Sequence, residues 1–178
     1  MTIQFGVLTV GMPLWVTAHT RAPAATVALL LVLNTVVVAL CQVRAARMVR
    51  DVPAAGRVVL SAAVALVVAC GLYAAASRVV AAAAVAILVP AVLAHSLGEV
   101  LSEAGGWELA FELADPRAAG VYQGISQTGF AVGTAVAPAV VTSTAVNHGG
   151  PGWVVLAVMF LAAGVGTWGV AVRYRGEG

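Results

Sequence analysis

Long apolar runs separated by short polar breaks make up most of this sequence. The runs are rich in Ala, Val and Leu, and they lack the alternation of polar and apolar residues that marks the strands of an outer-membrane barrel. Inside a bilayer, backbone groups must be satisfied within the protein, so uninterrupted runs of this kind predict membrane-spanning helices. Hydrophobic residues form 62% of the chain and charged residues 9%, far from a soluble composition. The sequence therefore predicts an all-α, polytopic membrane helical bundle.

Polar breaks divide the chain into six predicted spans, which together form a single transmembrane domain. The first span rises only about 22 Å as a helix, less than the roughly 30 Å of the hydrocarbon core, so it is expected to be truncated. The fourth reaches about 52 Å if it is wholly helical, and it must tilt, bend or extend past the membrane. The predicted spans are residues 3–17, 24–43, 58–76, 79–113, 119–142 and 153–172.

The distribution of basic residues predicts the orientation of the spans. All nine basic residues are Arg. Because cytoplasmic loops are enriched in Arg and Lys, the most basic stretch, between the second and third spans, is predicted to be a cytoplasmic loop. Six spans then place both termini inside, N-in and C-in, in the cell inner (plasma) membrane. The net charge of +2 gives no reason to expect a nucleic-acid partner. The Arg residues of the predicted loop are Arg44, Arg47, Arg50 and Arg57.

The fourth span contains ionisable residues that membrane segments usually lack. Inserting a carboxylate at the bilayer centre costs about 2.5 to 3.5 kcal/mol on insertion scales, which suggests that these side chains have a function. His95, Glu99 and Glu103 are spaced i, i+4 and i+8, so they form one stripe along the helix. Coupling-ion and substrate sites of transporters lie near the bilayer midplane, where His95 and Glu99 are expected.

We expect Glu99 to bind and release a proton, with His95 and Glu103 as proton relay or substrate contacts. The structural alternatives are that Glu99 bonds a neighbouring helix, that His95 is a packing histidine, and that Glu103 meets water in a cytoplasmic cavity. Trp107 either stacks on an aromatic or cationic substrate or anchors the membrane interface. The amides of Asn34 and Gln127 are expected to face either the cavity or a neighbouring helix.

Several short motifs occur together in the second half of the chain. Leu97-Gly98-Glu99 is followed by AGGWELAFELADPRAAG, by Tyr122-Gln123-Gly124, and by a ridge of small residues that lets another helix approach closely. In this order and spacing, the chain resembles the C-terminal half, helices seven to twelve, of a drug-efflux transporter of the major facilitator superfamily. The resemblance covers essentially the whole chain, although the Arg-rich loop lacks the Gly and Asp of the family's gating motif. The small ridge contains Gly129, Gly133 and Pro138.

This resemblance implies half of a major-facilitator fold and proton-coupled export, or proton antiport, of a small organic compound by alternating access. It also implies a partner, because such a transporter has two six-helix halves. The partner is either a missing N-terminal half or a second copy in a homodimer.

Other functions remain as alternatives to transport of an organic compound. The first is a non-transporting six-helix remnant or membrane interaction protein. A metal-ion transporter is less favoured, because His95 and Glu99 lack the further His or Cys ligands that such sites usually contain. No metal or cofactor is expected. No enzyme is expected either, because the sequence has neither a Ser and His pair nor the His-Glu-x-x-His motif of an intramembrane hydrolase.

Overall fold

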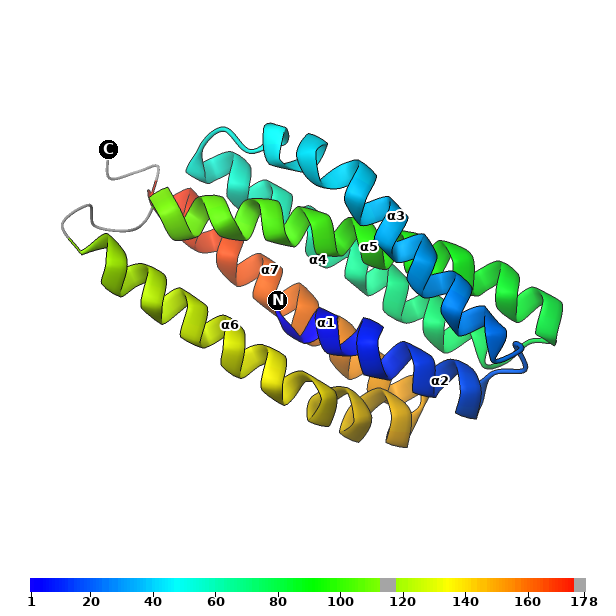
Figure 1. Cartoon of the computed structure of the whole chain (residues 1–178). Coiled ribbons are helices and arrows are strands. Elements are labelled where there is room, and N and C mark those ends of the chain that lie inside the picture. Colours follow the sequence, from blue (N-terminus) through cyan, green and yellow to red (C-terminus); the bar gives the residue numbers. More distant parts are fainter. Residues whose placement is uncertain (113–117, 175–178) are drawn as a thin grey trace.

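The structure, a computed structural model, describes residues 1–112 and 118–174. All regular structure in these residues is helical, and the helices lie side by side in one bundle (Figure 1). The elements are α1 (Ile3–Gly6), the π-helical turn η1 (Val7–Gly11), α2 (Met12–His19), α3 (Ala25–Met48), α4 (Val52–Ala76), α5 (Ala81–Glu112), α6 (Ala119–Val141), the π-helical turn η2 (Thr142–Val146) and α7 (Gly150–Tyr174).

Within the described residues, five helices are long and apolar enough to span a membrane: α3, α4, α5, the continuous helix Gly120–Val146, and α7. The chain is therefore an all-helical, multi-pass membrane protein. The predicted first span, residues 3–17, is not among these five, because α1, η1 and α2 together form a shorter helical segment. This segment begins about midway along the bundle and packs against α6 (Figure 1).

The predicted Arg-rich loop is mostly helical, so α3 and α4 extend beyond the predicted spans. Arg44 and Arg47 lie in α3, Arg57 lies in α4, and only Arg50 lies in the connection between them. Arg is a good helix former, so a helix continues beyond its apolar stretch where nothing breaks it. Helix α3 ends at Met48. Asp51 then caps the start of α4, since its Oδ1 accepts a hydrogen bond from the Ala54 N–H at 2.6 Å.

Most of the described Arg residues lie at one end of the bundle, which we call the Arg-rich end. The turns at residues 20–24, 77–80 and 147–149 share the opposite end, where Arg21 and Arg78 lie (Figure 1). Arg117 and Arg175 fall outside the described residues. The described Arg residues at the Arg-rich end are Arg44, Arg47, Arg50, Arg57 and Arg173.

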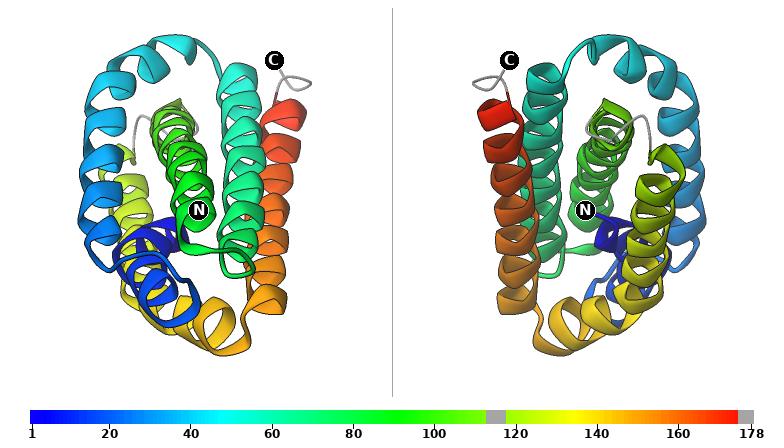
Figure 2. Two further views of the ribbon diagram at one scale, coloured as in Figure 1. Left: turned by 90° about the vertical axis from the view of Figure 1, so that its right-hand side faces the viewer. Right: turned by 90° about the vertical axis from the view of Figure 1, so that its left-hand side faces the viewer.

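The centre of the bundle is formed by α4 and α5. The two helices pack along each other, with α3 against α5 and α7 against α4 (Figure 2). Gly98 and Gly105 of α5 allow this approach, because a Cβ atom at either position would meet Leu66, Val59 or the backbone of α4 at less than ordinary contact distance. The ionisable stripe of α5 is thereby held next to α1, α3 and α4.

Candidate functional site

Helix α5 presents a row of polar side chains to its neighbours. His95 is only 1% exposed and Ser96 and Ser102 are buried, whereas Glu99 and Glu103 are half-buried. The helical repeat places these residues on one side of α5, as their spacing predicted. The row therefore passes from a closed core at His95 to a partly accessible region at Glu103.

Asn34 of α3 holds the carboxylate of Glu99. Its Nδ2 atom donates to Glu99 Oε2 at 3.0 Å and to Ser96 Oγ at 2.9 Å, and Ser96 in turn donates to the Val92 carbonyl oxygen at 2.8 Å. Asn34 is 7% exposed. Of the two placements that the sequence left open for this amide, the structure shows contact with a neighbouring helix, and that contact includes the candidate proton carrier.

A second amide, Gln4 of α1, joins α5 one turn further along. Its Nε2 atom donates to Ser102 Oγ at 2.6 Å, and the Ser102 hydroxyl donates to the backbone oxygen of Glu99 at 3.0 Å. Gln4 is fully buried. Sequence reasoning did not select Gln4 as a site residue, although a lone amide within an apolar run is the signal by which it is recognisable.

His95 lies against an aromatic ring of the neighbouring helix α4. Its ring lies edge-on to that of Tyr73 in α4, with 6.3 Å between the ring centroids. Among the described residues, neither His95 Nε2 nor the Tyr73 hydroxyl has a hydrogen-bonding partner. The His95 Nε2 atom therefore makes no direct bond to Glu99. A proton relay between His95 and Glu99 stays a prediction.

A cavity of about 370 Å³ lies beside the polar row, on the side of Glu103. Glu103 and Trp107 of α5 line it from one side, and Gln127 and Phe130 of α6 line it from the other. Ser102 belongs both to this cavity and to the hydrogen bonds of Gln4. The structure thus brings Glu103, Trp107 and Gln127 together around one cavity, while Glu99 and Asn34 form the adjoining polar contact.

The small ridge of α6 packs against the N-terminal helical segment over part of its length. Gly133 lies against Thr2, and Ala137 lies against Gly6. Gly129 has open space beside it and lines the cavity. Pro138 lies inside α6, where it follows Ala137. The ridge therefore serves both as a packing surface and as one wall of the cavity.

The cavity offers hydroxyl, amide and indole groups and one carboxylate, a combination suited to an organic molecule with polar groups. No group of three His, Cys, Asp or Glu side chains that could hold a metal ion occurs within residues 1–112 and 118–174. Comparisons of the chain with protein-family models, with curated proteins and with solved structures found no match.

Proposed function

We propose that this chain is a half, or a fragment, of a major-facilitator-type membrane transporter that exports a small organic compound in exchange for protons by alternating access. The proposal depends chiefly on one observation, the half-buried Glu99 carboxylate held by Asn34 beside a polar cavity. The resemblance of the chain to drug-efflux transporters, carried by the motifs between Leu97 and Pro138, supports it.

The contact between Glu99 and Asn34 gives a physical route from proton binding to helix movement. A charged carboxylate accepts a stronger hydrogen bond from the Asn34 amide than a protonated one does. Proton binding at Glu99 therefore loosens α3 from α5, and proton release restores the contact. Ser96 of α5 remains as a second acceptor for the same amide, so the contact between α3 and α5 weakens without being lost.

A second six-helix unit, either a missing N-terminal half or another copy of this chain, is proposed to complete the cavity. The N-terminal half of α6 supports this, since Tyr122, Ile125 and Gln127 are exposed and the Gln127 amide lines the cavity. Exposed amides are costly against lipid and inexpensive against a polar partner surface.

Transport by the purified chain tests the proposed function. We expect proteoliposomes that contain the chain to move ethidium, a small amphipathic probe, when a pH gradient is imposed. Light scattering of the same purified protein in detergent should show a dimer. A stable monomer that moves no more ethidium than empty liposomes would rule out the homodimer as the transporting unit. If the chain stayed inactive with any N-terminal half encoded upstream added back, the non-transporting remnant would be supported instead.

Filling the cavity from α6 is expected to slow this transport. Gly129 has open space beside it, so Gly129→Leu adds a side chain to the cavity without disturbing helix packing. An added side chain that crowds the bound ethidium costs about 1 to 3 kcal/mol of binding free energy. This cost corresponds to about a 5- to 150-fold loss of apparent ethidium affinity. Gly124→Leu is the matched control, because it also points into open space and does not line the cavity. Equal effects of the two substitutions would contradict the assignment of the cavity.

The proposed N-in, C-in orientation in the plasma membrane is tested by labelling. His148 lies in the turn before α7, at the end opposite the Arg-rich one. In a background with Cys41 and Cys70 replaced by Ser, His148→Cys is expected to react with an impermeant maleimide added outside intact cells. Arg50→Cys is expected to react only after the cells are opened. The orientation would be refuted if Arg50→Cys reacted in intact cells and His148→Cys reacted only after the cells were opened.

A further inference from the structure

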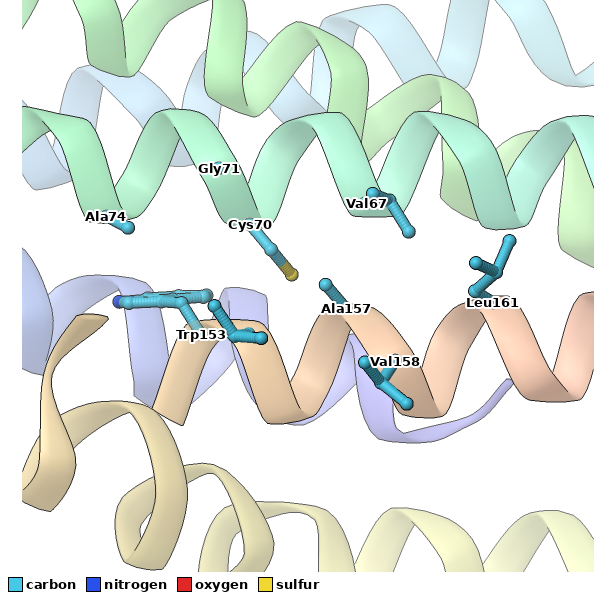
Figure 3. A pocket seen from close by; sticks show the side chains of 9 residues that line it. Val67, Cys70, Gly71, Ala74, Trp153, Ala157, Val158 and Leu161 are labelled. Carbon is cyan, nitrogen blue, oxygen red and sulfur yellow. The ribbon is translucent and has the colours of Figure 1, made fainter. Parts of the chain in front are cut away.

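A second cavity, of about 260 Å³, lies between α4 and α7, away from the polar row of α5 (Figure 3). Its lining is apolar apart from the Cys70 thiol and the Trp153 indole nitrogen. Gly71 forms part of one wall, and a Cβ atom there would meet nothing within 4 Å. On the α7 side, Val154 and Val158 are 62% and 61% exposed, so this groove opens on an exposed apolar surface of two helices that are long enough to span a membrane.

The groove runs along the helices from one end of the bundle toward its middle. Ala74 lies near the end of α4, and Trp153 lies near the start of α7. The last turn of α4 and the first turn of α7 lie at the same end of the bundle (Figure 1). From Trp153 to Leu161, the lining of α7 extends about 12 Å at the helical rise per residue. The groove thus extends from the level of the membrane interface into the hydrocarbon region.

The interfacial end of the groove provides a hydrogen-bond donor. Trp153 is stacked on Tyr73 with 4.9 Å between ring centroids, and it meets Trp15 edge-on at 5.6 Å. The Trp153 ring is therefore fixed. Its Nε1 atom has no hydrogen-bonding partner among the described residues, although a buried indole N–H usually has one. In Figure 3 this nitrogen lies at the Ala74 end of the ring, away from Leu161.

A cation lies at the same end, beyond the groove. Arg78 is exposed in the turn after α4, and its Nη2 atom would be 3.4 Å from a Cβ atom built on Gly150, the first residue of α7. From the interface inward, the order is a guanidinium, an indole N–H and an apolar groove. A glycerophospholipid presents a phosphate, an ester carbonyl and an acyl chain in that same order.

We propose that this groove binds one glycerophospholipid, with an acyl chain between α4 and α7, its ester at Trp153 and its phosphate at Arg78. This lipid site is separate from the proposed transport cavity and does not depend on the proposed function.

Thermal unfolding of delipidated protein in a maltoside detergent tests the site, with dioleoyl phosphatidylglycerol as the added probe. The midpoint temperature of the wild type is expected to rise with lipid concentration and to saturate. Gly71→Leu fills the groove without a clash, so it should match or exceed the wild-type midpoint without lipid and lose the lipid-dependent rise. Gly166→Leu, at an equally open position of α7 outside the groove, should keep that rise.

Two further variants test the polar contacts. Trp153→Phe keeps a ring in place and removes the donor, and it is expected to raise the half-saturating lipid concentration about 2- to 10-fold. Arg78→Gln should raise this concentration up to about fivefold, and high salt should weaken binding to the wild type. If Gly71→Leu does not fold, Val158→Phe covers the groove from an exposed position. A wild type with no saturable rise, or a groove-filled variant that retains it, overturns the proposal.

Discussion

Replacing Glu99 with Gln is expected to abolish ethidium transport driven by a pH gradient and to leave the protein folded. Gln retains an oxygen that accepts the 3.0 Å hydrogen bond from Asn34, but this oxygen binds no proton in the physiological range. The contact between α3 and α5 therefore stays formed and no longer alternates with proton binding. In proteoliposomes, the transport rate should fall to that of empty liposomes at every imposed pH gradient.

Two comparisons separate proton coupling from general damage at this position. Glu108 is another carboxylate of α5, and it lines a different cavity, together with Arg50, at the Arg-rich end. Glu108→Gln should therefore leave transport unchanged. Asn34→Leu removes the donor to Glu99 and should reduce the rate without abolishing it. If Glu99→Gln retained transport that responds to the pH gradient, Glu99 would not be the proton carrier.

The helical class of the fold was predictable because the membrane leaves few alternatives. A chain with so few charges and such long apolar runs can satisfy its backbone only as helices. The helix ends were less predictable. Arg44 and Arg57 are polar, and for that reason the sequence favoured a loop around them. Arg is nevertheless a good helix former, so α3 continues to Met48, and Asp51 then caps the start of α4.

The candidate site was predictable along one helix and not between helices. The spacing of His95, Glu99 and Glu103 fixed their common face on α5, since the helical repeat alone determines it. The partners of that face depend on how neighbouring helices are rotated and how deep they lie, which no local pattern encodes. For this reason Gln4 was not recognised, and Tyr73 gave no signal that it lies against His95.

A single methyl group added to Gly105 is expected to destabilise the bundle, whereas the same change at Gly106 is not. A Cβ atom on Gly105 would lie 2.6 Å from Val59 Cγ2 and 2.8 Å from the Ala55 carbonyl oxygen, and that oxygen is fixed in the backbone of α4. A Cβ atom on Gly106 would meet nothing within 4 Å. Ala favours a helix over Gly by up to about 1 kcal/mol at both positions, so the two variants differ mainly in packing.

We therefore expect Gly106→Ala to leave the midpoint of thermal unfolding unchanged or to raise it. Gly105→Ala should lower stability by about 1 to 3 kcal/mol, the usual cost of overpacking, which corresponds to a fall of about 2 to 12 °C. Scanning calorimetry in detergent measures both midpoints under the same conditions. Equal shifts in the two variants would show that α4 and α5 do not approach each other at Gly105. The position of the polar row of α5 beside α1 and α3 would then lose its structural support.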